Sequence, residues 1–324
     1  MSSLKEIKKP VATHLSEFNK VFRASVKSNT ALLDIIMRYI LKSKGKQMRP
    51  VIVIYSAGLT GKINHSTYRA ATLVELLHTA TLVHDDVVDD SYRRRGRFSI
   101  NAIWRNKIAV LAGDFLLSRG MLLAVENNDH KMLEIVSRAV KEMSEGELLQ
   151  IEKARKLDID EEVYYNIIRR KTASLLASCF AVGAVSTGSA DDVVEKMYKI
   201  GENLGMAFQI KDDLLDFGEG NNIGKPTGID IKEKKMTLPL IYLLNNSSTK
   251  EKKEFIKIVK KHNNDKKKVN QLIAQVKASG GIGYAVKKMH EFKQTALDLL
   301  STFPENLSRQ MLKEIVDYTI ERKK

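Results

Sequence analysis

The placement of proline constrains this chain more than any other feature of its sequence. Only five prolines occur among 324 residues, and none lies between Pro50 and Pro226, an interval longer than half of the chain. Because proline lacks a backbone N–H and clashes with the preceding turn, its absence allows long helices to run without a break. Apolar residues recur there at helical spacing, as at Leu73, Leu76 and Ala80, and strict alternation is not sustained. The sequence therefore predicts an all-α bundle of about ten or more helices.

The composition is typical of a soluble globular protein and excludes wholesale disorder. Hydrophobic residues make up 43% of the chain and charged residues 29%, and the formal net charge is +15. The first residues show no secretory leader, no apolar run reaches the length of a membrane span, and Cys179 is the only cysteine. We expect a cytoplasmic protein with one domain over residues 1–324, with core motifs at about 42–240 and C-terminal helices at 241–324.

Two clusters of aspartates share one spacing, and each follows an apolar helical segment. The first consists of Asp85, Asp86 and Asp89, and the second of Asp212, Asp213 and Asp216. On a helix, positions i and i+4 lie on one face, so these like charges are crowded unless a cation neutralises them. One such cluster would be read as a solvated helix end. Two copies favour magnesium, which takes a few carboxylates together with water and substrate phosphates as ligands.

Basic residues gather near these clusters in the sequence. An arginine run, Arg93 to Arg97, follows the first cluster, and a basic turn from Lys44 to Pro50 opens an apolar helix. Lys171 interrupts an apolar stretch, and a long glycine-containing segment, 218–236, carries further lysines. Guanidinium groups and helix N-termini both suit phosphate oxygens, although an isolated lysine is usually a surface residue. Together with the aspartates, these residues indicate a diphosphate-binding site.

With these motifs, the chain resembles the trans-isoprenyl diphosphate synthases of the polyprenyl synthetase family from about Lys42 to its C-terminus. Five motifs follow the order of that family: Gly45-Lys46 with Arg49-Pro50, His78 with Asp85 to Asp89 and Arg94-Arg95-Gly96, Lys171-Thr172, Gln209 with Asp212 to Asp216, and Lys225 with Lys235 to Pro239. The resemblance implies a homodimer with an isoprenoid-synthase-type fold, in which helices surround a central cavity and the aspartate clusters face each other at its mouth.

The resemblance also implies a role for each matched residue. Magnesium ions, three per active site, would be held by Asp85, Asp89, Asp212, Asp213 and Asp216. Isopentenyl diphosphate would be bound by Lys46, Arg49, His78 and Arg95. The allylic diphosphate would contact Arg94, Lys171, Thr172, Gln209, Lys225 and Lys235. The catalytic set would comprise Asp85, Asp86, Asp89, Arg94, Lys171, Asp212 and Lys225.

The implied reaction agrees with the chemistry of these side chains. Ionisation of an allylic C–O bond leaves negative charge on a departing diphosphate, which magnesium, arginine and lysine stabilise. The double bond of isopentenyl diphosphate then attacks the allylic cation, and loss of a proton restores an alkene. The chain departs from the family pattern at Gln47, where an arginine is usual, and at Lys234, where glycine is common.

Two small residues one helical turn before the first cluster bear on product length. In the family, bulky aromatic side chains at the positions of Ala80 and Thr81 give short products, so this pair predicts an open cavity floor. We expect successive additions to give a product of about C30 to C45, with octaprenyl diphosphate as the specific prediction. A floor on another helix, near Phe115 or Met121, is the other location considered.

Other functions fit the sequence less well. A shorter-chain farnesyl or geranylgeranyl synthase would keep the same motifs, and a non-catalytic partner subunit would be expected to lose aspartates. A class I terpene cyclase would have a different second metal motif and would lack the isopentenyl-binding residues. The charge of +15 would suit nucleic acid, but aromatic residues make up only 6% of the chain and no recognition motif is present. We expect no nucleic-acid partner, and a basic surface that contacts membranes during product release.

Overall fold

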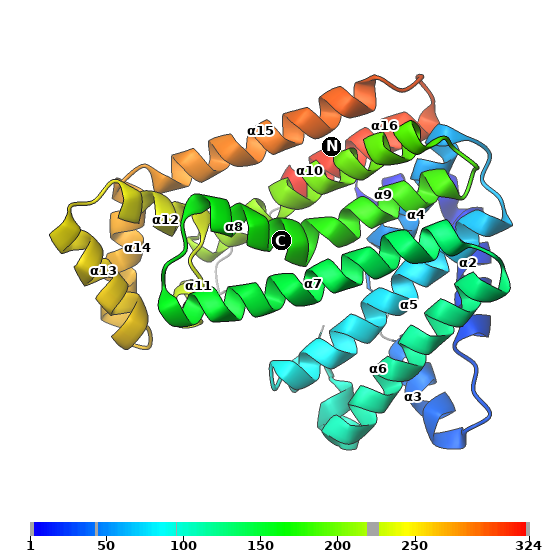
Figure 1. Ribbon diagram of the computed structural model, residues 1–324, viewed down its shortest axis with the longest axis horizontal. Helices are drawn as coiled ribbons and strands as arrows, with labels where there is room; N and C mark the ends of the chain where they lie inside the picture. Colours follow the sequence, from blue (N-terminus) through cyan, green and yellow to red (C-terminus); the bar gives the residue numbers. More distant parts are fainter. Residues whose placement is uncertain (1–2, 43–44, 95, 219–226, 322–324) are drawn as a thin grey trace.

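The computed structural model describes residues 3–42, 45–94, 96–218 and 227–321. Long helices run side by side along most of the molecule, and a short helical pair projects at one end (Figure 1). The regular structure of the described residues is helical apart from a small hairpin, in which β1 (Arg93–Arg94) pairs antiparallel with β2 (Arg97–Phe98). The predicted all-α class is confirmed.

The helices follow one another through short connections. In chain order they are α1 (Leu4–Lys8), the 3-10 turn η1 (Lys9–Val11), α2 (Ala12–Ser25), α3 (Ala31–Lys42), α4 (Met48–Thr60), α5 (His65–Val88), α6 (Ile100–Glu126), α7 (His130–Lys156), α8 (Glu161–Ile168), the π-helical turn η2 (Arg169–Ala173), α9 (Ser174–Val185), α10 (Asp191–Asp216), α11 (Ile229–Lys232), α12 (Leu238–Asn245), α13 (Thr249–Lys261), α14 (Lys266–Ala278), α15 (Gly281–Ser301) and α16 (Leu307–Glu321). Four of the longest, α5, α6, α7 and α10, lie within the proline-free interval.

Helix α9 forms the centre of the bundle. Its residues are apolar all round, and Cys179, Phe180 and Val182 are fully buried. Glycines permit its close contacts: a Cβ added at Gly183 would lie 2.5 Å from the Ser56 Cβ of α4, and one added at Gly201 of α10 would lie 2.6 Å from the Ala177 Cα. These contacts hold α4, α9 and α10 together and fix the walls of the cavity described below.

Helix α6 is long and apolar enough, by length and composition alone, to cross a membrane. Arg105, Lys107 and Asp114 interrupt its apolar run. In the structure α6 packs lengthwise against α5 through buried Ala112 and Leu116, and 33% of its most apolar window is buried. The opposite side of the helix leaves large apolar side chains exposed, and such a surface is usually covered by a partner.

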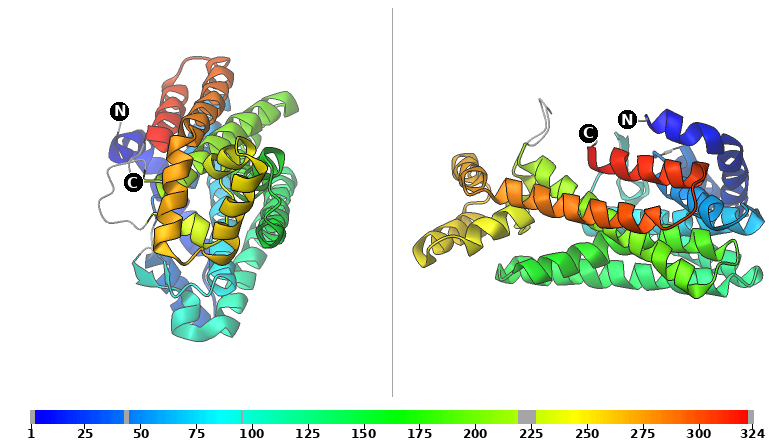
Figure 2. Two further views of the ribbon diagram at one scale, coloured as in Figure 1. Left: turned by 90° about the vertical axis from the view of Figure 1, so that its left-hand side faces the viewer. Right: turned by 90° about the horizontal axis from the view of Figure 1, so that it is seen from above.

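Two lysine-containing segments form helices. The long glycine-containing segment, 218–236, contains the short helix α11. The lysine-rich stretch 250–268 forms a hairpin of α13 and α14, and Asp265 caps α14 by accepting the backbone N–H groups of Lys267 and Lys268 at 3.0 and 3.3 Å. This hairpin forms the projecting end of the molecule in Figure 2.

The backbone of Arg105, near the start of α6, has φ 69° and ψ 166°, a region adopted almost only by glycine. We expect Arg105→Gly to stabilise the protein by about 1 kcal/mol, because relief of strain exceeds the entropy gained by the unfolded chain. A thermal melt should show a midpoint raised by about 1–2 °C. Arg105→Ala keeps the Cβ and should show no gain. An equal gain in both variants would assign the effect to the side chain and contradict backbone strain.

Candidate active site

A cavity of about 880 Å³ opens among α4, α5, η2, α9 and α10, beside α1 and α16. Charged side chains line part of it, including Lys46, Arg49, Asp85 and Lys171. The remaining wall is largely apolar and includes Ile52, Leu82, Met143, Leu175, Leu176 and Phe208. A cavity with this lining suits a ligand that has an anionic head and a hydrocarbon tail.

The first aspartate cluster stands at the C-terminal end of α5. Asp85 lies in the last turn, and Asp89 ends the helix with its N–H donated to the Asp85 carbonyl at 2.8 Å. Partial burial and then the charge of Asp89 raise the pKa of Asp85, although its side chain keeps contact with solvent. The predicted crowding of negative charge is therefore present, and a bound cation would relieve it.

Asp86 is more buried than these two aspartates and has its own partners. It is 4% exposed and accepts a hydrogen bond from Nε of Arg94 at 2.7 Å. Its backbone carbonyl accepts a second hydrogen bond from the Asn101 side chain at 3.0 Å. Asp86 thus ties the β1–β2 hairpin to α5 and orients Arg94, a buried pairing that the helical spacing alone did not predict.

The turn η2 carries Lys171 and Thr172 into the cavity wall. Its π-helical geometry inserts an extra residue into the helix, a distortion frequent at functional sites. Gly146 of α7 allows this turn to pack closely, because a Cβ there would lie 2.9 Å from the Lys171 backbone nitrogen. The Lys171 ammonium pairs with Glu147, and its Nζ also lies 3.3 Å from Oε1 of Gln150.

The second aspartate cluster is held by a chain of hydrogen bonds. Thr172 donates to Oε1 of Gln209 at 2.8 Å, and Nε2 of Gln209 donates to Oδ1 of Asp213 at 2.9 Å. Tyr164 of α8 donates to the other oxygen of Asp213 at 2.7 Å. Burial, followed by the charge of Asp230, raises the pKa of Asp213 to about 7. The predicted neighbours Thr172, Gln209 and Asp213 are therefore brought together.

Asp216 organises the segment that follows α10. Its side chain accepts the backbone N–H groups of Ile229 and Asp230 at 2.9 and 3.1 Å, which fixes the start of α11. Burial, followed by the charge of Asp216, raises the pKa of Asp230 to about 6. Asp230 and Tyr164 are thus site residues that the sequence analysis missed. Asp230 lay within the loop singled out there, whereas no pattern distinguished Tyr164.

Lys234, which stands where the family commonly has glycine, lies at the C-terminal end of α11. Lys234 has φ 60°, and its N–H donates to the Ile231 carbonyl at 3.1 Å while that of Lys235 donates to the Asp230 carbonyl at 2.8 Å. This pattern is a Schellman cap, in which glycine is favoured at the left-handed position. The cap presents Lys235, whose Nζ pairs with Glu233 at 2.6 Å and lies 3.9 Å from Asp230.

The basic turn before α4 forms another part of the cavity wall. Gln47 takes the left-handed conformation, and its side chain donates to Oδ1 of Asn19 at 3.0 Å. Gln47 therefore fastens the turn to α2. Nε of Arg49 is buried without a hydrogen-bond partner among the described residues. Lys46 lies with its Nζ 5.9 Å from the centre of the Tyr318 ring.

The residues of α5 that precede the aspartates divide between two environments. His78 and Thr81 line the cavity, whereas Ala80 is fully buried in a cluster that includes Ala109, Ala112 and Leu116 of α6. Thr81 donates its hydroxyl to the His78 carbonyl at 2.8 Å. Of the two residues predicted to form a floor, Thr81 therefore contacts the cavity directly and Ala80 contacts α6.

The carboxylates of the site are the groups available to bind a metal ion. Among the described residues, no three His, Cys, Asp or Glu side chains converge into a site for a single ion. Instead, two groups of carboxylates are crowded at helix ends with raised pKa values at Asp85, Asp213 and Asp216, burial being the first cause of each. This arrangement fits hard cations that take one or two protein carboxylates and complete their shell with phosphate and water.

Several residues named in the sequence analysis lie outside the described residues. They are Lys44, Arg95, Lys225 and Pro226.

Comparison with known proteins identifies what this architecture resembles. The family model described as "Polyprenyl synthetase" matches residues 30–276. The chain is 34% identical to the all-trans-nonaprenyl-diphosphate synthase (geranyl-diphosphate specific) of Rhodobacter capsulatus, over 98% of this chain and 97% of that protein.

Two solved structures extend the comparison to the whole fold. A decaprenyl diphosphate synthase from R. capsulatus superposes with a TM-score of 0.93 at 32% identity, covering 99% of this chain and 100% of the other. A polyprenyl synthase from Caulobacter crescentus CB15, complexed with calcium and isoprenyl diphosphate, superposes with a TM-score of 0.88 at 33% identity, covering 99% and 98%.

The raised pKa of Asp213 makes stability depend on pH in the metal-free protein. Between its ordinary value of 3.8 and about 7, folded Asp213 binds a proton that the unfolded chain does not, so the free energy of unfolding should fall as pH rises through this window. We expect a loss on the order of a few kcal/mol, measurable by urea denaturation at pH 4.5 and 7.5 with chelator present. Asp213→Asn should reduce the slope, with the raised pKa of Asp230 retaining part of it, whereas the exposed control Glu254→Gln should keep the full slope. An unchanged slope in Asp213→Asn would contradict this assignment.

Proposed function

Because the chain belongs to the polyprenyl synthetase family and is a long-chain trans-prenyltransferase, we propose that its principal product is octaprenyl diphosphate. The enzyme condenses isopentenyl diphosphate with an allylic diphosphate in successive head-to-tail additions. The observation that carries the specific proposal is the cavity, which joins basic and acidic groups to an apolar wall and has Thr81, a small residue, facing it. The small side chain of Thr81 leaves the floor open for products of about C30 to C45, and octaprenyl lies within that range.

Different side chains bind the two diphosphates. Lys46 and Arg49 hold the diphosphate of isopentenyl diphosphate, assisted by His78. Lys171 and Thr172 contact the allylic diphosphate, and Glu147 restrains the Lys171 ammonium until an anion competes for it. Gln209 and Tyr164 hold Asp213, so the second cluster does not need to reorganise when charge develops.

Magnesium fits the carboxylates of the site, and five residues would hold it: Asp85, Asp89, Asp212, Asp213 and Asp216. When bound, three such ions would neutralise the charge that accumulates on the departing diphosphate. The apolar wall, which includes Leu175 and Phe208, excludes water from the allylic cation. Released diphosphate would accept the proton that the condensed carbocation loses as the new alkene forms, since no side chain is assigned as a dedicated base.

The proposed reaction and product length can be tested together. Purified protein incubated with magnesium, farnesyl diphosphate and radiolabelled isopentenyl diphosphate should give a ladder of dephosphorylated products ending at C40 on reversed-phase chromatography. Thr81→Phe should shorten the ladder, because the ring enters the cavity, with total incorporation retained. Ala80→Phe is the matched variant: its ring must enter the packing with α6, so lower thermal stability is expected together with any change in length.

The length of the products distinguishes the proposed function from its alternatives. Termination of the wild-type ladder at C15 or C20 would replace the product assignment with farnesyl or geranylgeranyl diphosphate. An absence of incorporation would instead favour a non-catalytic partner subunit. An unchanged ladder in Thr81→Phe would place the floor elsewhere.

We propose that the protein is a homodimer joined through α6. On this helix, Val110, Leu111, Met121, Leu122 and Val125 are between 41% and 55% exposed. The spacing places these residues along one side, opposite the face buried against α5. A second copy presenting the same face would bury both stripes, as expected for a symmetric dimer.

Charged substitutions on this stripe should prevent the association. We expect Leu111→Glu combined with Leu122→Glu to convert a dimer of about twice the chain mass of 36.6 kDa into monomers in light scattering. The control Lys257→Glu, on the exposed side of α13, should remain dimeric. A wild-type monomer, or a dimer that survives both substitutions, would contradict this interface.

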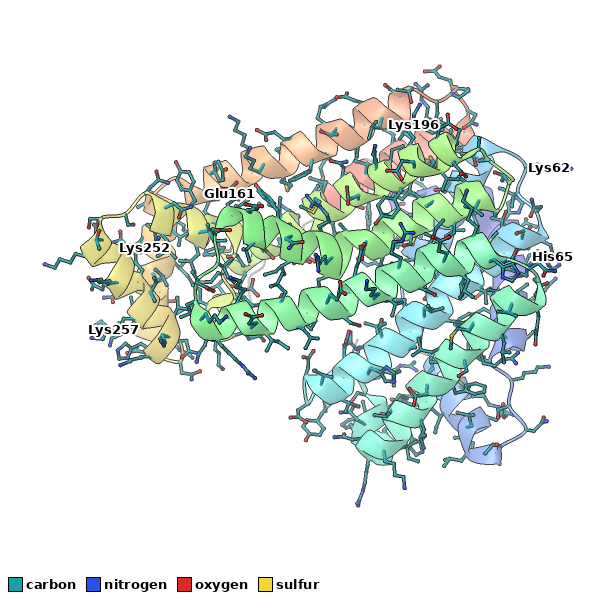
Figure 3. The ribbon with its side chains drawn as sticks, viewed as in Figure 1. Lys62, His65, Glu161, Lys196, Lys252 and Lys257 are labelled. Atoms are coloured by element: carbon teal, nitrogen blue, oxygen red, sulfur yellow. The ribbon has the colours of Figure 1, made fainter. Side chains whose placement is uncertain are left out.

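We propose a cytoplasmic enzyme that contacts membranes when its product leaves. The α13–α14 hairpin, residues 249–278, holds ten lysines against three acidic residues, so it supplies +7 of the net +15 charge. Lys252 and Lys257 point outward from this end of the molecule (Figure 3). Such a surface suits anionic lipid headgroups. Cell fractionation and sedimentation with phosphatidylglycerol vesicles test these two proposals; failure to bind vesicles at low salt would remove the second.

A further inference from the structure

The N-terminal helix α1 is fixed at the edge of the cavity. Ile7 is completely buried, and its carbonyl accepts a hydrogen bond from the buried Tyr55 hydroxyl of α4 at 2.5 Å. Helix α1 also contacts α16, and the two ends of the described chain lie close together in both views of Figure 2. The residue after Ile7 is therefore held in a defined position rather than on a free terminus.

That residue, Lys8, lines the large cavity together with Lys46 and Arg49. Tyr318 and Thr319 of α16 continue the wall, and the Lys46 ammonium lies beside the Tyr318 ring. Lys8 belongs to none of the motifs described above, whereas its neighbours Lys5 and Lys9 on the same segment are exposed.

The charge of Lys8 is not compensated within the described residues. Its ammonium makes no hydrogen bond or ion pair there, and burial lowers its pKa. A partly desolvated ammonium without a counterion is unfavourable, and an anion bound beside it would recover that cost. The buried Nε of Arg49 also lacks a partner, so two basic groups of this cavity have unused capacity for an anion.

We propose that Lys8 binds the diphosphate of the non-allylic substrate together with Lys46 and Arg49. The inference rests on the proposed function for the identity of the ligand, and on the cavity for its charge. Lys8 is placed with this diphosphate because α1 packs against α4 and α16, the elements that present Arg49 and Tyr318. The allylic diphosphate instead meets Lys171 and the aspartates at the ends of α5 and α10.

Steady-state kinetics can separate this role from a structural one. Lys8→Ala should raise KM for isopentenyl diphosphate about tenfold or more, the effect of losing one charge-assisted hydrogen bond. KM for farnesyl diphosphate should stay within twofold of wild type, and Lys8→Arg should restore most of the affinity. Lys5→Ala and Lys9→Ala are matched controls on the same segment and should leave both KM values unchanged. Equal effects of Lys8→Ala on both substrates, or a similar effect of a control, would overturn the assignment.

Direct binding of diphosphate tests the role of Lys8 without catalytic turnover. Calorimetric titration of the folded, metal-free protein with inorganic diphosphate should show affinity reduced about tenfold in Lys8→Ala and unchanged in Lys5→Ala. Thermal melts establish that each variant is folded. If the wild type makes no polyprenyl product but Lys8→Ala still weakens diphosphate binding, the proposed function fails and the anion site remains. If product forms normally and Lys8→Ala changes neither KM nor diphosphate binding, the inference about Lys8 is wrong.

Discussion

The site depends on one physical constraint: carboxylates are concentrated at the ends of two helices where burial disfavours their charge. Asp213 shows it most clearly, because it is enclosed by Tyr164 and Gln209 and its pKa is raised to about 7. The surrounding helices must be rigid enough to hold these groups together without a cation. The glycine contacts of α9 and α10 and the absence of proline from the long helices provide that rigidity. The buried carboxylates thus lower the stability of the folded protein, and the close packing of α9 and α10 compensates for this loss.

Features set by helical periodicity were predictable from the sequence. The spacing of Asp85 and Asp89 placed both on one face of a helix, and the proline-free interval between Pro50 and Pro226 indicated long unbroken helices. The same periodicity did not determine helix rotation relative to neighbours. Ala80 and Thr81 are adjacent in sequence, but a turn of about 100° per residue sends one toward α6 and the other toward the cavity. Which of them contacts a ligand is decided by tertiary packing.

Contacts between distant segments were the least predictable. The hydrogen bond between Tyr164 and Asp213 joins residues 49 positions apart, and neither residue type predicts the pairing. Lys8 is one lysine among many in a basic chain, and only the docking of α1 through Ile7 distinguishes it. Asp86 was grouped with Asp85 by spacing, yet its burial against Arg94 gives it a different environment from Asp85. In each case the missing information was which surfaces meet, which local sequence patterns do not contain.

The position of α1 and α16 has a practical consequence. Leu4 of α1 and Thr319 of α16 line the same cavity, so a group attached to either helix there lies beside the substrates. A bulky label on these helices would compete with ligands for space, and a charged label would change the local potential. The turn between α9 and α10, with Gly188 and Ser189, is a surface connection outside the residues that line this cavity. A label introduced in that turn would report on the enzyme without occupying the entrance to its site.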